Sequence, residues 1–142
     1  MDVICLSSAD YRLLKTRYAE HGNSQRRLTG ALLEAGAVDA LERARALRRL
    51  EQRFGIDLGM VCHRFEHRND AATHPIERTV MAYVASWRGT PGGARELWVL
   101  PDRIRQVREL MNEGAVAPPG AARLADEAPE PPAGAAGADL AF

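Results

Sequence analysis

The chain has 142 residues, with 19 basic and 19 acidic side chains and a hydrophobic fraction of 46%. This length is enough for one globular domain or two small lobes, and it excludes a large multidomain enzyme. No apolar run reaches the roughly 20 residues of a membrane span, and the first residues lack the pattern of a signal peptide. The two cysteines, Cys5 and Cys62, cannot form a disulfide framework. We therefore expect a reduced, cytoplasmic protein that is not bound to a membrane.

The zero net charge hides an uneven distribution along the chain. Residues 1–116 carry 18 basic and 15 acidic side chains (+3), whereas residues 117–142 carry one basic and four acidic side chains (−3). The second stretch also contains five of the eight prolines. Because such a segment buries too little apolar surface to offset its conformational entropy, residues 117–142 are predicted to form a largely disordered acidic tail.

Residues 1–55 are predicted to form an antiparallel helical hairpin. The apolar side chains in its second half recur at helical spacing: Ala40, Leu41, Ala44, Leu47, Leu50 and Phe54. On the opposite side, Arg45, Arg49 and Arg53 follow one another at intervals of four, which is typical of a solvated helix face. The chain is predicted to reverse at Gly22 or at Gly36, and the sequence does not decide between them.

Residues 56–116 are predicted to form a small antiparallel β-domain with one helix at its end. The predicted strands cover residues 61–67, 78–87 and 97–100, where side chains alternate or are β-branched and aromatic. A helical period returns in residues 102–113. The predicted fold class is therefore α+β, with a helical lobe, a β-rich lobe and a disordered tail.

The segment His63-Arg64-Phe65-Glu66-His67 matches H-x-x-E-H, the motif of inverted zinc proteases. That chemistry needs both imidazoles one helical turn apart on a single face, together with a third ligand. On the predicted strand, His63 and His67 would lie roughly 13 Å apart and Glu66 would point to the opposite face. A zinc-dependent hydrolase is therefore only our third hypothesis, and we expect no catalytic residue and no cofactor.

Direct binding of nucleic acid has weak support in the sequence. Eighteen of the nineteen basic residues are arginines, and the first 116 residues are mildly positive. Most of these arginines have acidic neighbours, however, so the strong electrostatic footprint of a nucleic-acid-binding domain is missing. We therefore expect no direct contact with nucleic acid.

Two stretches resemble the Gre-type transcript-cleavage factors. Leu6-Ser7-Ser8-Ala9-Asp10-Tyr11-Arg12-Leu13-Leu14-Lys15 is similar to the opening of that family, where a short apolar lead precedes a hairpin. Leu97-Trp98-Val99-Leu100-Pro101, followed by a helix, stands where the family has a strand, Ser-Pro and a short helix. The length and the acidic end resemble the short-hairpin branch, the regulator of nucleoside diphosphate kinase.

The resemblance implies a non-enzymatic regulator that binds RNA polymerase near its secondary channel and modulates transcription. The hairpin would point into the channel, and a β-domain similar to the FKBP fold would dock at the rim, with Leu100 and Pro101 at the docking edge. Glu34 and Asp39 flank one candidate hairpin turn without the acidic motif of the cleavage factors, so they are expected to contact the partner and not to support cleavage.

A second hypothesis comes from the broad apolar face of residues 40–54. Leu41, Leu47 and Leu50 could serve pairing between chains as well as a core within one chain. The protein would then be a small helical partner-binding protein of the inhibitor or chaperone type, with a homodimer as one form.

Overall fold

The computed structural model describes residues 1–115, so the predicted acidic tail lies outside the described residues. The chain divides into two compact units, and the boundary falls between Pro101 and Asp102. Within residues 1–115, no helix is both long enough and apolar enough to cross a membrane.

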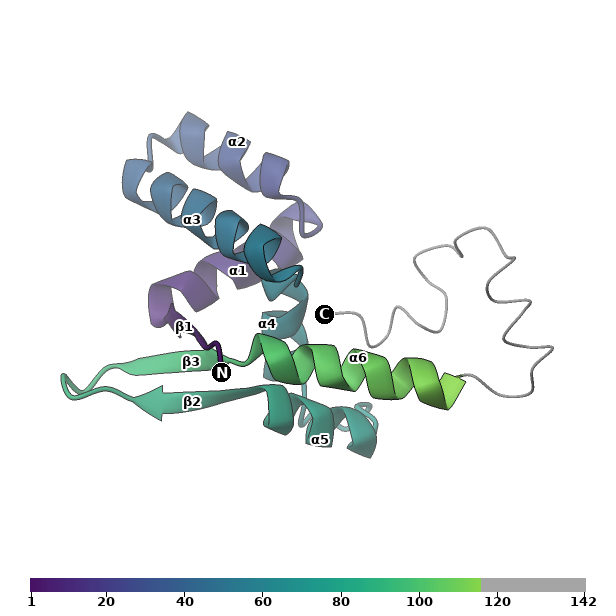
Figure 1. The fold of residues 1–142 in the computed structure, drawn as a ribbon. Coiled ribbons are helices and arrows are strands. Elements are labelled where there is room, and N and C mark those ends of the chain that lie inside the picture. The colour runs from purple at the N-terminus through teal and green to yellow at the C-terminus, as the bar shows by residue number, and fades with distance from the viewer. Residues whose placement is uncertain (116–142) are drawn as a thin grey trace. The chain divides into compact units, whose positions relative to one another are not determined.

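Unit 1 holds five helices and three strands among the described residues (Figure 1). In chain order these are β1 (Ile4–Ser7), α1 (Ser8–His21), α2 (Gln25–Ala35), α3 (Val38–Phe54), α4 (Leu58–Glu66), α5 (Pro75–Val84), β2 (Ala85–Gly89) and β3 (Arg95–Val99). Helix α6 (Pro101–Ala115) forms the described part of unit 2 from Asp102 onward. The fold is mixed α+β, as the sequence predicts.

The strands predicted at residues 61–67 and 78–87 are wrong. The first segment lies in α4 and its C-cap, and most of the second lies in α5, with only residues 85–87 in β2. Strong helix start signals explain this outcome. The carboxylate of Asp57 accepts a hydrogen bond from the Met60 backbone N–H at 2.9 Å, and Pro75 occupies the first turn of α5. Segregated helical and β-rich lobes therefore do not form.

The three strands form one antiparallel sheet in the order β1-β3-β2. Leu97 of β3 is the register partner of Leu6 on one side and of Trp87 on the other. The prediction of a strand at residues 97–100 and of a helix at 102–113 is confirmed by β3 and α6, whereas the pairing of β1 with β3 was not expected. The first residues of unit 1 are thereby joined to its last strand.

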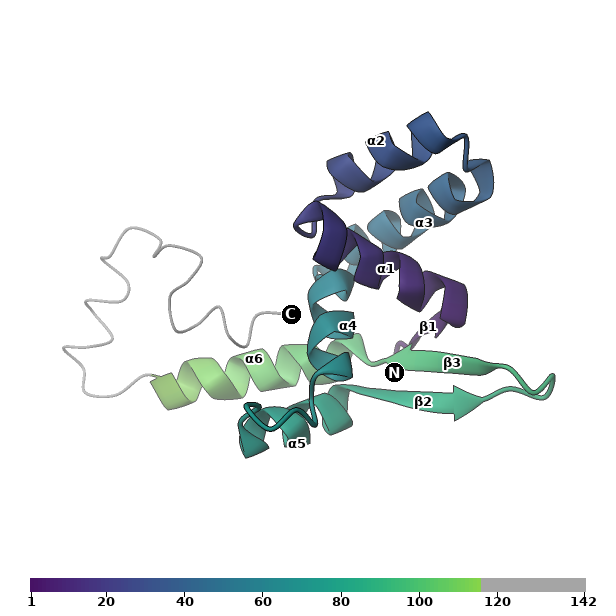
Figure 2. The ribbon, with the colours of Figure 1, turned by 180° about the vertical axis from the view of Figure 1, so that it is seen from behind.

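Both candidate turn glycines end a helix. Gly22 and Gly36 adopt left-handed φ values of 58° and 66° as C-caps of α1 and α2, where a side chain would be strained. Residues 1–55 therefore contain three helices, of which α2 and α3 lie side by side (Figures 1 and 2). Leu41 and Leu47 are only 7% and 3% exposed, so the apolar face considered for dimer formation is largely buried within the chain.

A buried ion pair fastens α1 to α3 and to the start of α4. Arg17 and Glu51 are each 2% exposed, and both terminal nitrogens of the guanidinium donate to the carboxylate at 2.7 Å. The Glu51 carboxylate also accepts the backbone N–H of Leu58 at 2.7 Å. Although burial alone disfavours the charged form, the hydrogen bonds and charge of Glu51 raise the pKa of the Arg17 guanidinium.

The same network fixes the first turn of α4 through a close approach of the chain. The Asn23 side chain accepts from Arg17 Nε at 3.0 Å and donates to the Asp57 carboxylate at 2.7 Å. A Cβ atom at Gly59 would lie 2.1 Å from Asn23 Oδ1, so only glycine fits there without displacing the network. The position of α4, which carries residues 63–66, is thus set by polar contacts between residues that are more than 30 positions apart in the sequence.

Candidate functional site

The H-x-x-E-H residues lie on α4 and its C-cap, not on a strand. The ring centroids of His63 and His67 are 4.7 Å apart, one helical turn along the chain, so the wide separation expected from a strand is wrong. Together with Tyr18 and Glu66 they line a hollow of about 280 Å³ between α1 and α4. The helix therefore supplies the first requirement of a zinc site.

The second requirement, a third ligand, is not met in residues 1–115. No group of three or more histidine, cysteine, aspartate or glutamate side chains there could hold a metal ion. Glu66 forms an ion pair with Lys15, and His67 Nδ1 lies 2.7 Å from an Asp70 carboxylate oxygen. His63 stacks on Tyr18 at 4.1 Å between ring centroids. Burial and the neighbouring His67 lower the pKa of His63, which keeps its imidazole neutral at pH 7.

The residues predicted to bind a partner lie at two separate places. Pro101 is less than 2% exposed, and the Leu100 backbone N–H donates to the Val84 carbonyl at 2.9 Å. This segment offers a partner little accessible side-chain surface. Glu34 and Asp39 are both exposed, near the end of α2 and in the first turn of α3.

A different site emerges where α4, α5 and the sheet meet. A hollow of about 310 Å³, which we call the arginine–tryptophan pocket, is lined by Phe65, Arg68, Ala82, Ala85, Ser86, Trp87 and Arg95. Trp87 forms its apolar wall and is held by an edge contact with Tyr11 at 5.1 Å and with Phe65 at 6.3 Å between ring centroids. No carboxylate lines this pocket, so its charged lining is entirely positive.

Both arginines of the pocket are positioned by aromatic rings. The guanidinium carbon of Arg68 lies 3.8 Å from the Phe65 ring centroid, and that of Arg95 lies 4.9 Å from the Trp87 ring centroid. Arg68 also donates to the Phe65 carbonyl oxygen. A ring contact through the face of a guanidinium leaves N–H groups at its edge free to bind an anion. The pocket therefore presents two oriented cationic donors beside an aromatic wall.

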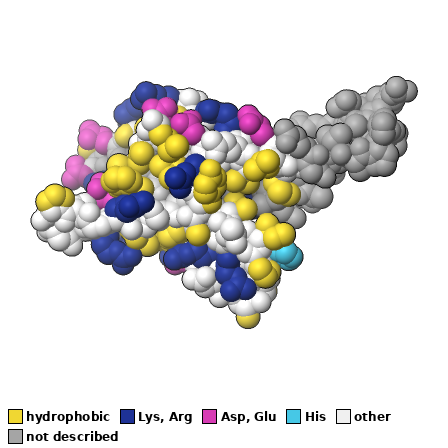
Figure 3. Space-filling view, turned by 60° about the horizontal axis from the view of Figure 1, so that its bottom comes forward, with side chains coloured by type: hydrophobic (Ala, Val, Ile, Leu, Met, Phe, Trp, Pro, Cys, Tyr) yellow, Lys and Arg dark blue, Asp and Glu magenta, His cyan; other side chains and the backbone are white. Residues whose placement is uncertain are grey.

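Further arginines extend this positive surface along α5 and the β2–β3 hairpin. Arg88 stacks on Trp98 at 5.2 Å from the ring centroid, and Arg78 is exposed on α5. Among the described residues, neither of them nor either pocket arginine makes an ion pair within 4.0 Å. Figure 3 shows Lys and Arg side chains interspersed with hydrophobic ones on this side of the molecule, with Asp and Glu side chains toward its upper and left edges.

The connection before α5 is ordered by its own polar groups. Thr73 Oγ1 donates to the His67 carbonyl oxygen at 2.6 Å, and His74 Nδ1 accepts the Ile76 backbone N–H at 3.2 Å as the N-cap of α5. The helix that follows exposes Thr79 and Tyr83, the latter to 43%. The Thr79 hydroxyl donates to the Pro75 carbonyl at 3.2 Å, and its oxygen remains able to accept a hydrogen bond on the helix that leads into β2.

Sequence reasoning missed this pocket because the segments that form it were assigned to the wrong elements. Arg68 and Arg95 are 27 residues apart, and their meeting depends on α5 turning directly into β2. A usable signal was present nevertheless, since the glycine-rich loop of residues 90–94 is flanked on each side by one arginine and one tryptophan, Trp87 and Arg88 before it and Arg95 and Trp98 after it.

No family model matches this chain, and neither a curated protein nor a solved structure is found to match it.

Proposed function

We propose that this chain is a non-enzymatic protein that binds nucleic acid through the arginine–tryptophan pocket and the adjoining surface of α5 and the β2–β3 hairpin. The observation that carries the proposal is the pair Arg68 and Arg95, both stacked on aromatic rings, both without a carboxylate partner among residues 1–115 and both lining one hollow. We expected no contact with nucleic acid because most arginines have acidic neighbours in the sequence, whereas neither Arg68 nor Arg95 has an ion-pair partner within 4.0 Å in residues 1–115.

The chemistry of the pocket supports a phosphate group as its ligand. Arginine binds phosphate through two parallel N–H donors, and such charge-assisted hydrogen bonds are stronger than neutral ones. The Ser86 side chain adds a hydroxyl to the lining, and Trp87 offers a ring against which a sugar or base can pack. A volume of about 310 Å³ is at the lower end of known ligand sites and accommodates one phosphate with part of its nucleoside.

The helix beside the pocket supports a duplex as the nucleic acid. An α-helix fits the major groove of B-DNA, and in helix-turn-helix proteins the second of two consecutive helices lies there. Helices α4 and α5 follow one another in this way, although residues 67–74 make their connection longer than the usual turn. Arg78, Thr79 and Tyr83 provide the exposed groups that contact phosphates and base edges.

The test is a titration of a fluorescently labelled 20-base-pair duplex at several salt concentrations between about 50 and 200 mM. Each phosphate contact contributes about −0.9 to the slope of log K against log salt. Arg68→Ala combined with Arg95→Ala is therefore expected to reduce this slope by about two and to weaken binding at least tenfold. Arg12→Ala removes an exposed arginine that does not line the pocket and serves as the control. Equal affinities for the double variant and the wild type would refute the proposal.

A second candidate function is favoured by the end of the α2–α3 pair. Leu33 and Val38 are 59% and 63% exposed on either side of Gly36, next to Glu34 and Asp39. Exposed apolar side chains with a polar rim mark contacts with other proteins, and Glu34 and Asp39 would belong to that rim. RNA polymerase remains our proposed partner for this surface. The β-domain that we expected to dock on the polymerase, however, does not form as predicted.

Co-elution with RNA polymerase on a sizing column tests this second function. The wild type is expected to co-elute, and Leu33→Ser combined with Val38→Ser is expected to abolish co-elution without unfolding the chain. Failure of the wild type to co-elute at low salt would remove the polymerase from consideration.

A further inference from the structure

A second group of arginines lies on α2 and α3, outside the arginine–tryptophan pocket. Six exposed arginines lie in the first turn of α2 and in residues 45–53 of α3, and we call them the arginine face: Arg26, Arg27, Arg45, Arg48, Arg49 and Arg53. A side-chain amide of Gln25 donates to the Ala44 carbonyl at 3.0 Å, which holds the start of α2 against the middle of α3. Arg26 and Arg27 therefore begin α2 beside the part of α3 where the arginine row starts.

Helix stability does not account for this arrangement. The first turn of α2 has no acidic residue, and Arg26 and Arg27 stand there at the positive end of the helix dipole. Like charges at intervals of four, such as Arg45, Arg49 and Arg53, also repel one another along a helix. Among these six side chains only Arg48 has an ion-pair partner in the described part of the chain, at 3.6 Å from Glu51.

The acidic residues of the same helices lie toward one end of the arginine row or are buried. Glu34 and Asp39 are near the Gly36 end of the pair, and Glu42, one turn before Arg45, lines a hollow with Asp39 and Arg49. Glu51 is buried in its contact with Arg17. The outward row of Arg45, Arg49 and Arg53 spans eight residues, which is about 12 Å of helix. One strand of a duplex carries a phosphate about every 3.4 Å along its axis, so this row is opposite three or four phosphates.

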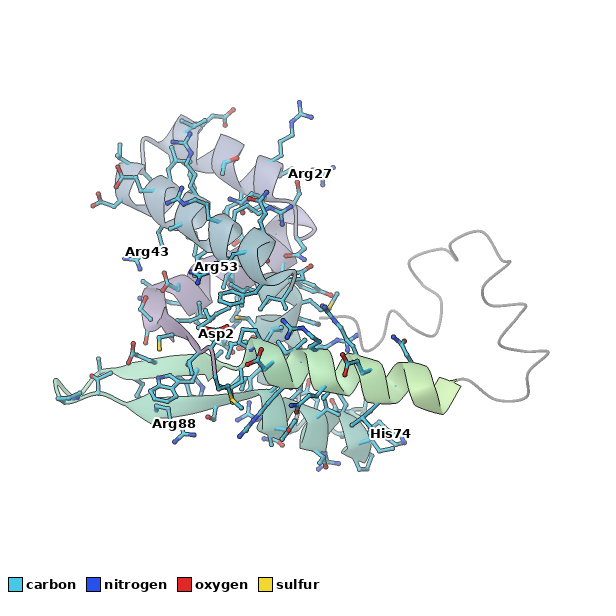
Figure 4. All side chains as sticks on the ribbon, viewed as in Figure 1. Asp2, Arg27, Arg43, Arg53, His74 and Arg88 are labelled. Atoms are coloured by element: carbon cyan, nitrogen blue, oxygen red, sulfur yellow. The ribbon has the colours of Figure 1, made fainter. Side chains whose placement is uncertain are left out.

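The arginine face and the pocket occupy different parts of unit 1. Helices α2 and α3 lie at one end of the unit and β2 and α5 at the other (Figures 1 and 2). Figure 4 places Arg27 and Arg53 on the α2–α3 side and Arg88 beside the hairpin, with their side chains well separated. The two surfaces are therefore separate places at which nucleic-acid segments can bind.

We propose that the arginine face binds the phosphate backbone of a second nucleic-acid segment, so that one molecule bridges two duplexes. The inference rests on the proposed function, because it assigns the first duplex to the pocket and its surroundings. Because the arginine face is positively charged, the ligand that complements it is a polyanion. The regularly spaced guanidinium groups of Arg45, Arg49 and Arg53, which make no ion pair within 4.0 Å in residues 1–115, match a regularly spaced phosphate chain.

A capture experiment tests bridging with the full chain. A 30-base-pair duplex is fixed to beads, protein is bound to it, and retention of a second, fluorescent duplex of different sequence is measured. The wild type is expected to retain the second duplex. Arg45→Glu combined with Arg49→Glu is expected to remain bound to the beads and to retain at least tenfold less of the second duplex. Glu42→Gln, an exposed change on the same helix, is the control and is expected to behave like the wild type.

The outcomes separate the two proposals. Equal retention by the wild type and by the Arg45/Arg49 variant overturns the inference, because the second duplex would then be held elsewhere, for example by a second copy of the chain. No retention by the wild type also overturns it. If the pocket variant Arg68→Ala/Arg95→Ala binds a single duplex normally while the Arg45/Arg49 variant loses all binding, the proposed function of the pocket fails and bridging fails with it.

Discussion

The buried pair of Arg17 and Glu51 gives the most quantitative prediction. Glu51→Gln keeps the shape of the side chain and an oxygen that can still accept the Leu58 N–H. It removes the charge that two guanidinium nitrogens contact at 2.7 Å in a site where both residues are 2% exposed. The substitution therefore leaves a buried cation without its principal partner.

The magnitude follows from the cost of breaking a buried ion pair, which is about 3–5 kcal/mol when one partner is removed. The Asp57 carboxylate, 3.4 Å from Arg17 and 42% exposed, still balances part of the Arg17 charge. We therefore expect Glu51→Gln to lower the free energy of unfolding by about 3 kcal/mol. Such a loss is a large share of the 5–15 kcal/mol that holds a typical domain together. It corresponds to a fall in Tm of roughly 10–20 °C for a unit of about 100 residues.

Urea denaturation followed by tryptophan fluorescence measures the effect, since Trp87 packs against Tyr11 and Phe65. Glu42→Gln, an exposed change on the same helix, is expected to stay within about 0.5 kcal/mol of the wild type. Arg17→Met combined with Glu51→Gln removes the stranded cation and should recover part of the loss. A loss below about 1 kcal/mol for Glu51→Gln would refute the reasoning.

Three further predictions follow from the structure. Gly59→Ala is expected to cost about 1–3 kcal/mol in urea denaturation, because the added Cβ has no room, whereas Gly30→Ala on open helix surface should stabilise by about 0.5–1 kcal/mol; equal effects would contradict this. A thiol reagent at pH 8 should titrate only the exposed Cys5 in the native protein and both cysteines in denaturant, because burial raises the pKa of the Cys62 thiol well above its ordinary range. Two reactive thiols in the native state would count against the burial of Cys62. Burial and His67 lower the pKa of His63, so the unfolded chain binds more protons and the free energy of unfolding should fall as the pH drops below about 6.5. His63→Phe should reduce that fall, and an unchanged pH profile would show that His63 does not contribute.

The sequence predicted helices and strands well where the apolar side chains recur at one clear spacing and a residue that ends a helix, such as glycine, follows them. Gly22 and Gly36 were both recognised as possible ends of a helix, and both end one. Prediction failed at residues 61–67, where Val61, His63 and Phe65 alternate with polar groups over too short a stretch to separate strand from helix. The decisive information was the carboxylate of Asp57 as N-cap, which lies just before the alternating run.

The pairing of β1 with β3 could not be read from local pattern. Residues 4–7 form only four residues of strand, and their register partner Val99 is more than 90 residues away from Ile4. Leu6, which the family resemblance places in a short apolar lead before the hairpin, lies in β1, and the first helix begins at Ser8. A strand this short is determined by the sheet edge that it completes and by burial of Ile4 and Leu6, not by its own propensity.

The wrong assignment of α4 as a strand also affected which functions we favoured from the sequence, because it changes the positions of the two histidines and of Arg68. With residues 61–67 as a strand, His63 and His67 are too far apart for one metal ion, and Arg68 has no defined relation to Trp87. With the helix, the histidines approach each other but still lack a third ligand within residues 1–115, while Arg68 and Arg95 meet beside one aromatic wall. The charge count of the sequence does not reveal this site. Only the folded structure shows which arginines contact an aromatic ring and which form an ion pair with a carboxylate.

The buried network and the pocket are connected through α4. Asp57 caps this helix at one end and belongs to the Arg17–Glu51 network, and Phe65 and Arg68 stand at its other end in the pocket. A weakened network therefore lowers the fraction of folded chain but leaves the pocket intact in the molecules that remain folded. Affinity per folded molecule should thus be unchanged by Glu51→Gln and reduced by Arg68→Ala, which separates residues that hold the fold from residues that hold the ligand.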